Sequence, residues 1–283
     1  MRFFRAYRVP WVKDDVHERL KDMAPDEVAT LRRAGLSVRN GIFARWNGSF
    51  YYPSKIPDLT GIKDRKYLDH TGTHLNRGVG DLMRYAALVG FAETSDFGPH
   101  RMLTEEQRKI EGRLPDEALY ALALYLHSLE TPVSPHAVDE HAAAGKALFQ
   151  REGCTGCHTP GLYTNNKLTL ASGFQPPADT PATLDILRVS VGTDPNLALR
   201  TRKGTGFYKV PSLRGLWYRA RLLHDGSVGS LEEMFDPKRL QETHVPGGWT
   251  LPGVKTRAIV GHEFGLKLSA VERKQLIAFL RTL

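Results

Sequence analysis

The chain has 283 residues, with 39 Lys and Arg against 31 Asp and Glu, and a formal net charge of +8. This length suits one large or two medium domains, and a hydrophobic content of 41% is enough to build cores. No stretch is apolar enough to predict a transmembrane helix. The short basic stretches lack the aromatic interleaving or motif of nucleic-acid binding. The basic surplus fits solvated helix faces or a docking face for an acidic redox partner.

The first half of the chain offers one clear helix. The N-terminal segment MRFFRAYRVPWVKDDVHERLKDM carries charges throughout and has no apolar run of signal-peptide type, so no export signal is predicted within it. Residues 116–130, DEALYALALYLHSLE, predict an amphipathic helix. The following stretch, ETPVSPH, contains two prolines and predicts a stop and a linker.

A second amphipathic helix leads directly into the only two cysteines. Residues 139–154, DEHAAAGKALFQREGC, repeat apolar residues at helical spacing. Cys154, Cys157 and His158 follow at i, i+3 and i+4, so a helical turn places all three side chains on one side. The apolar face of the helix consists of Ala142, Gly145, Leu148 and Phe149.

The Cys-x-x-Cys-His pattern favours covalent attachment of one haem c. Two thiols so spaced form thioethers with two vinyl groups of one porphyrin, and the following imidazole binds the iron from one face. A redox-active dithiol and half of a zinc site are the alternatives. A structural zinc site needs four ligands, and a thioredoxin-like dithiol needs a βαβ context. The flanking sequence supplies neither.

The C-terminal residues 268–283, LSAVERKQLIAFLRTL, predict another amphipathic helix. Ser269 and Glu272 have the spacing of a capping box. A helix before the attachment motif and a helix at the C-terminus, packed across each other, is the arrangement of class I cytochromes c. The apolar stripe of this last helix consists of Leu276, Ile277, Phe279, Leu280 and Leu283.

Three stretches carry a family resemblance: CTGCHTPGLYTNN, YKVPSLRGLWYRARLLHDGSVGSLEEMFD and GHEFGLKLSAVERKQLIAFLRTL. They resemble the C-terminal domain of the bacterial di-haem cytochrome c peroxidase superfamily. Residues 53–88, PSKIPDLTGIKDRKYLDHTGTHLNRGVGDLMRYAAL, are most similar to the di-haem rubber oxygenase-like proteins of that superfamily. The resemblance covers roughly residues 50–283 and is faint before them.

The chain departs from this superfamily in having one attachment motif where the superfamily has two. The helix at 116–130 echoes the C-terminal helix, so we expect two cytochrome-like units. The predicted fold is mainly α, with a partial or haem-less cytochrome c-like unit at residues 1–132 and a class I cytochrome c-like domain with covalent haem at 138–283. Either the chain begins partway through a longer di-haem protein, or its first unit has lost its haem; we favour the first. Because c-type haem is attached outside the bacterial cytoplasm, the resemblance implies a periplasmic or secreted protein.

The resemblance also suggests roles for single residues. His224, in LLHDGSV, matches a histidine that the family carries in a loop near the haem environment between the domains. Arg214, in VPSLRGL, is expected to pair with a haem propionate, since a guanidinium binds a carboxylate in bidentate fashion. A structural histidine in a turn and a surface ion pair are the respective alternatives.

The sixth iron ligand is expected from the segment before the last helix. The peroxidase branch carries a methionine there, and His262, in AIVGHEFGLKLS, takes its place here. Met234, His224, His244 and an open site are the alternatives. With His158 and His262 on its iron, the domain relays electrons to or from a redox partner protein or an adjacent catalytic haem domain. A single-haem peroxidase or oxygenase with an open iron site is the second hypothesis, and an unused motif in a structural domain is the third.

Overall fold

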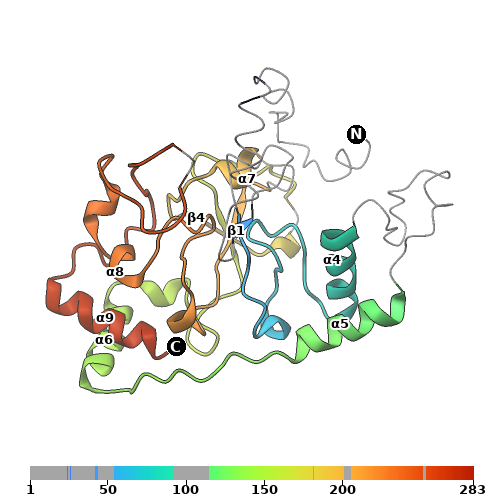
Figure 1. Cartoon of the computed structure of the whole chain (residues 1–283), viewed down its shortest axis with the longest axis horizontal. Coiled ribbons are helices and arrows are strands. Elements are labelled where there is room, and N and C mark those ends of the chain that lie inside the picture. Colours follow the sequence, from blue (N-terminus) through green and yellow to red (C-terminus); the bar gives the residue numbers. More distant parts are fainter. Residues whose placement is uncertain are drawn as a thin grey trace.

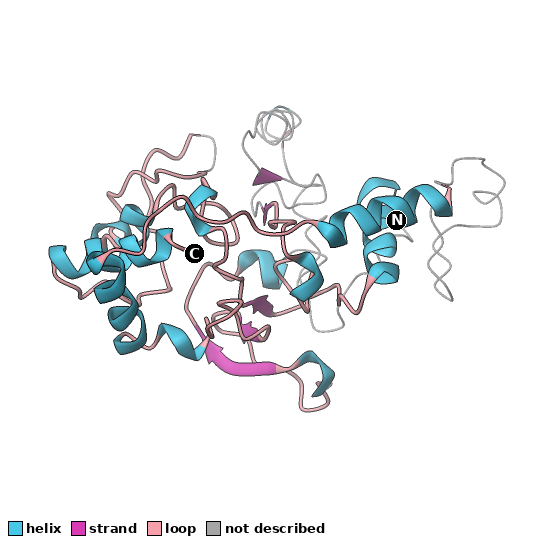
Figure 2. Cartoon of the chain, turned by 90° about the horizontal axis from the view of Figure 1, so that it is seen from below, coloured by secondary structure: helices cyan, strands magenta, loops and turns pink. Residues whose placement is uncertain are grey.

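The computed structural model of the chain (Figure 1) describes most of its residues. In that part the predicted mainly α class is confirmed, and short strands lie between the helices. The described residues are 54–91, 115–180, 182–200, 205–250 and 253–283, with Ala24, Asp26 and Ile42–Phe43. The α-helices are α4 (Val79–Phe91), α5 (Asp116–Ser128), α6 (Glu140–Arg151), α7 (Asn196–Arg200), α8 (Leu231–Met234) and α9 (Ala270–Arg281). Helices α6, α8 and α9 lie at one end of the molecule and α4 and α5 at the other, with the strands and α7 between them (Figure 1 and Figure 2).

Helices α6 and α9 pack across each other and carry the main core. Asp139 caps the start of α6, and Ser269 with Glu272 forms the predicted capping box of α9. The two helices come close at Gly145, where a Cβ atom would lie 1.9 Å from the carbonyl oxygen of Gln275. The predicted apolar faces are buried, with Ala142, Gly145, Leu148 and Phe149 on α6 and Leu276, Ile277, Phe279 and Leu280 on α9.

A small sheet, absent from the sequence-based expectation, lies between the helical ends. Strand β3 (Leu168–Leu170) is central, with β4 (Ile186–Ser190) parallel on one side and β5 (Phe207–Lys209) antiparallel on the other. β1 (Ile42–Phe43) and β2 (Ser54–Lys55) form a separate antiparallel pair. Single 3₁₀ turns connect these elements: η1 (Ile62–Asp64), η3 (Cys154–Gly156), η4 (Ala182–Leu184), η5 (Leu216–Tyr218) and η6 (Pro237–Leu240).

The predicted helix at 116–130 is α5, which packs against α4. Residues 129–139, which include the predicted linker at 130–136, contain no helix or strand and run from α5 to α6 along one edge of the molecule (Figure 1). The small core of this end consists of Ile62, Leu68, Leu82 and Ala123.

Residues 54–76 pack onto the C-terminal half of the chain. The backbone N–H of Lys209 donates to the carbonyl of His70 at 2.9 Å, and that of Lys55 donates to the carbonyl of His224 at 2.7 Å. The Asn166 side chain donates to the carbonyl of Asp64 at 2.9 Å. These contacts join the two predicted units across the expected boundary at residues 132–138.

Candidate functional site

The two cysteines and His158 lie on one helical turn, as their spacing predicts. Gly153, with φ 76°, ends the preceding helix and starts the turn η3. The backbone N–H of His158 donates to the carbonyl of Cys154 at 2.8 Å, and that of Cys157 donates to the same carbonyl at 3.3 Å. All three side chains line one cavity of about 200 Å³.

The state of the thiols argues against a reactive dithiol. Burial raises the pKa of Cys154 to about 11, with a further contribution from Glu152, and burial also raises the pKa of Cys157. A thiol-disulfide active site needs the opposite, a thiolate stabilised by a lowered pKa. In the part of the chain that the structure describes, no group of three or more His, Cys, Asp or Glu side chains is arranged to hold a metal ion. Neither the dithiol nor the zinc alternative gains support.

His158 is held in one tautomer by a backbone contact. Its Nδ1 donates to the carbonyl of Tyr163 at 3.0 Å. Burial lowers the pKa of His158, so the ring is neutral. A hydrogen bond at one ring nitrogen leaves the lone pair on the other, which is how metal-binding histidines are oriented. Nε2 of His158 is therefore the atom prepared for a metal.

His262 reaches the same cavity from the loop before α9. Gly261 and His262 both adopt left-handed backbone conformations, with φ 78° and 48°. The backbone N–H of His262 donates to the carbonyl of Val191 at 2.5 Å. Burial, with a smaller effect of His158, lowers the pKa of His262 to about 4. Its buried Nδ1 has no hydrogen-bond partner among the described residues.

The imidazoles of His158 and His262 have the separation that one shared metal requires. Their ring centroids are 6.3 Å apart. A metal-bound imidazole nitrogen lies about 2 Å from its metal and about 1 Å from its ring centroid, so two imidazoles on opposite sides of one metal have centroids about 6 Å apart. The remaining walls are mostly apolar and include Leu213, Leu216, Leu222, Leu231, Met234 and Phe235. The donor set and the cavity therefore fit a haem.

The other sequence-predicted residues divide into two groups. His224 and Met234 line the cavity. The ring of His224 stacks on Tyr208, with centroids 4.3 Å apart. Arg214 is exposed and lines a different, small cavity beside Gly61, so the structure does not bring it to the cavity that the cysteines line.

His244, the alternative ligand from the Pro/Gly-rich loop, is engaged elsewhere. Its Nε2 lies 2.7 Å from Oε1 of Glu233, and it does not line the cavity.

The site also includes cavity-lining residues that sequence reasoning missed, Lys55, Lys209 and Arg219. All three lie in stretches that carry the family resemblance, but the sequence analysis gave them no role, and long-range contacts bring them together.

Comparison with known proteins identifies a relative. No family model matches the chain. The methylamine utilization protein MauG of Methylorubrum extorquens is 29% identical to it over 161 residues, which cover 52% of this chain and 35% of MauG. The predicted resemblance is thereby confirmed as a sequence similarity to MauG. The match spans about a third of the length of MauG.

Three solved structures are similar to parts of this chain at low sequence identity. A MauG-like protein associated with microbial copper homeostasis has a TM-score of 0.49 at 18% identity, covering 81% of this chain and 73% of its own. Hydrazine synthase of Kuenenia stuttgartiensis has a TM-score of 0.45 at 18% identity, covering 82% and 73%. The diheme peroxidase BthA of Burkholderia thailandensis has a TM-score of 0.35 at 19% identity, covering 82% and 66%. The closer resemblance to the rubber oxygenase-like branch stays a prediction.

Proposed function

We propose that this chain is a haem c electron-transfer unit. Cys154 and Cys157 hold one haem through thioether bonds, and His158 and His262 bind its iron from opposite faces. The observation that carries the proposal is the pair of neutral imidazoles with centroids 6.3 Å apart in the cavity that the two cysteines line. The haem would supply a one-electron ferric/ferrous couple.

The protein's own residues favour relay over catalysis. With His158 and His262 both holding the haem iron, no position on the iron would be left for peroxide or dioxygen. The walls of the cavity are mostly apolar, and the carbonyl of Tyr163 fixes the orientation of His158. Because imidazole is a stronger donor than a thioether, two histidines give a lower reduction potential than a His/Met pair.

The wider setting of this unit is part of the same proposal. The crossing of α6 and α9 next to the attachment motif supports a cytochrome c-like domain at residues 138–283. We infer a periplasmic or secreted protein, in which the partner is a redox protein or an adjacent haem domain. Among the described residues no helix has the length and apolarity to cross a membrane.

The first experiment measures haem stoichiometry. The chain is exported in a host with a c-type maturation system, and haem is counted per polypeptide before and after acid-acetone extraction. We expect one haem per chain that resists extraction, and its loss in the Cys154→Ala/Cys157→Ala double variant. Extractable haem, or covalent haem retained by the double variant, contradicts the proposal.

The second experiment identifies the axial ligands by near-infrared magnetic circular dichroism. We expect a low-spin spectrum of two imidazole ligands for the wild type and its loss in His262→Ala. His244→Ala, on the residue that pairs with Glu233 outside the cavity, is the matched control and should keep the wild-type spectrum. A methionine-to-iron band in the wild type assigns the ligand to Met234 instead, and a high-spin wild type favours the open-site peroxidase.

A further inference from the structure

Beyond the two histidines, the cavity is lined by a basic cluster that the proposed function has not used. Lys55, Lys209 and Arg219 all line it, together with His70. Lys55 belongs to β2, Lys209 ends β5, and Arg219 follows η5. Three separate segments thus bring cationic side chains to one place in an otherwise mostly apolar site. Burying a charge is costly unless an opposite charge or hydrogen bonds compensate it.

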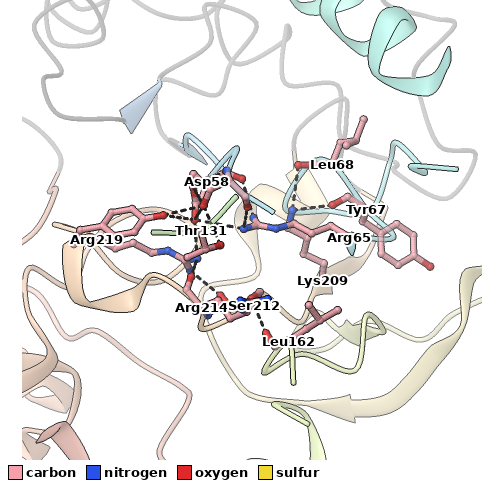
Figure 3. A network of polar contacts seen from close by, with 12 residues as sticks. Asp58, Arg65, Tyr67, Leu68, Thr131, Leu162, Lys209, Ser212, Arg214 and Arg219 are labelled. Atoms are coloured by element: carbon pink, nitrogen blue, oxygen red, sulfur yellow. Dashed lines mark hydrogen bonds and ion pairs between the residues drawn. The ribbon is translucent and has the colours of Figure 1, made fainter. Parts of the chain in front are cut away.

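Two of these side chains are fixed by contacts drawn in Figure 3. Nζ of Lys209 donates to the carbonyls of Tyr67 at 3.0 Å and Leu68 at 3.1 Å. Nη1 of Arg219 donates to the carbonyl of Ser212 at 2.7 Å. Both cations are therefore held in place before any ligand binds.

The cluster retains hydrogen-bond donors that no described residue satisfies. Nε of Arg219 is buried without a hydrogen-bond partner. Nζ of Lys55 forms no hydrogen bond or ion pair with a described residue. An unsatisfied buried donor costs about 1–3 kcal/mol, more when it is charged. Cationic hydrogen-bond donors without a partner in a cavity wall indicate that the cavity binds an anionic group.

The charge balance indicates how much negative charge is missing. Asp58 pairs with Arg65 and with Arg219, at 3.4 and 2.8 Å. Asp69 is the one carboxylate that acts on Lys209, and Asp58 is the one that acts on Lys55. Four basic side chains of this region thus share two carboxylates.

The surplus of positive charge contributes to the lowered pKa values of the two lysines. Burial, followed by the repulsion of Arg65, lowers the pKa of Lys209 to about 7. Burial, followed by the repulsion of Arg219, lowers the pKa of Lys55 to about 8. Two additional negative charges would balance the cluster.

The basic cluster and the thiols come from different segments of the chain, and both line the cavity. In a haem c, the two thioether-forming substituents and the two carboxylates lie on opposite halves of the porphyrin. A haem attached at the cysteines would therefore direct its carboxylates away from them.

We propose that Lys55, Lys209 and Arg219 form the receptor for the two carboxylates of the haem, in place of Arg214. This inference rests on the proposed haem function and assigns a role to the basic side chains of the cavity wall. It predicts that the cluster stabilises the carboxylates and raises the potential of the iron, since nearby positive charge favours the reduced state.

The test compares the reduction potential and the resonance Raman carboxylate modes of the holoprotein with those of Lys55→Met. Lys55 is the chosen position because its Nζ makes no hydrogen bond or ion pair with a described residue, so the fold should tolerate the change. We expect the ferric-to-ferrous ratio at a fixed potential to rise about tenfold, which is about 59 mV for a one-electron couple. A changed carboxylate mode should accompany it, and Lys55→Arg, which keeps the charge, should remain close to the wild type.

Arg214→Met is the matched control, because Arg214 is a nearby exposed arginine that does not line the cavity. It should leave both readouts unchanged, whereas Arg219→Met should change them. If all variants carry covalent low-spin haem and neither Lys55→Met nor Arg219→Met moves the potential or the modes, the receptor is overturned and the haem proposal stands. A wild type without covalent haem overturns both.

Discussion

Arg239 is a fully buried arginine whose partners are backbone carbonyls. Its Nε donates to the carbonyl of Met234 at 2.9 Å, and its Nη1 donates to that of Ile259. Its Nη2 donates to the carbonyls of Gly261 and His262, at 2.8 and 2.9 Å. One side chain thus ties the loop that carries His262 to the end of α8. It positions His262, whose left-handed backbone needs such support because non-glycine residues rarely adopt it.

We predict that Arg239→Met lowers the free energy of unfolding by about 3 kcal/mol or more, since each buried carbonyl left without a partner costs about 1–3 kcal/mol. Urea unfolding measures the loss. The low-spin haem signal should also fall, because the ligand loop is no longer fixed. The control is Arg281→Met: its ion pair with Glu232 is exposed and contributes less than about 1 kcal/mol. Equal stability of the two variants would refute the positioning role.

For single residues, the sequence identifies the groups that would bind a haem more readily than the long-range contacts that position them. Cys154, Cys157 and His158 form a local pattern, so their common turn could be predicted. His262 could be chosen by its place before the last helix. Arg239 could not, because its donors reach carbonyls as far along the chain as residue 262. The sequence analysis named Arg214 as the partner of a haem carboxylate and did not consider Arg219, five residues further along the same stretch, because no local pattern separates the two side chains.

Among the elements, α6 and α9 were predictable to within a few residues. Their apolar periodicity and capping residues are local properties, and the structure buries the faces that the pattern indicates. The sheet was not predicted. Strands β3 and β5 have three residues each, and their pairing joins segments far apart in the sequence. Such short strands show no periodicity that distinguishes them from loops.

The close approach of α6 and α9 gives a prediction for Gly145. A Cβ there would overlap the backbone of Gln275 on α9, at 1.9 Å from its carbonyl oxygen. Gly145→Ala should therefore lower the free energy of unfolding by about 1–3 kcal/mol, the usual effect of overpacking. Thermal or urea unfolding of the holoprotein measures it.

Gly80 in α4 is the matched control for this change. Nothing lies within 4 Å of a Cβ built there. Gly80→Ala should be neutral or stabilising by up to about 1 kcal/mol, because alanine favours a helix more than glycine does. If both variants gain stability, α6 and α9 are not held together at Gly145.

For the molecule as a whole, the docking of residues 54–76 onto the C-terminal half is the feature that sequence reasoning lacked. The two expected units end in similar amphipathic helices, and such a similarity can be read from the sequence. Contacts such as that between Lys209 and His70 depend on the folded arrangement and leave no local trace. The proposed carboxylate receptor lies across this junction, with Lys55 on one side and Lys209 and Arg219 on the other. Haem binding and the docking of the early segment should therefore stabilise each other.

The junction is also predicted to be sensitive to acid through Asp69. Its carboxylate accepts from the backbone N–H of His74 at 2.9 Å and from the hydroxyl of Thr71 at 2.8 Å. Burial alone would raise the pKa of Asp69, but the charge of His74 and these hydrogen bonds outweigh it and hold the pKa at about 2. An unfolded aspartate titrates near about 3.9. The unfolded chain therefore takes up this proton first as the pH falls.

Because the unfolded chain is protonated first, the free energy of unfolding falls as the pH is lowered. The contribution of Asp69 to stability is complete above about pH 4 and is lost as the pH falls through about 2, a difference of about 2 kcal/mol. Urea unfolding between pH 5 and pH 2 should show a smaller loss of stability in Asp69→Asn than in the wild type. Asp179→Asn, at an exposed position, should keep the wild-type slope. Parallel pH profiles for Asp69→Asn and the wild type would show that the turn at residues 69–74 does not depend on this charge. The turn presents the carbonyl of His70 to Lys209, so its loss at low pH should also release the early segment from the receptor.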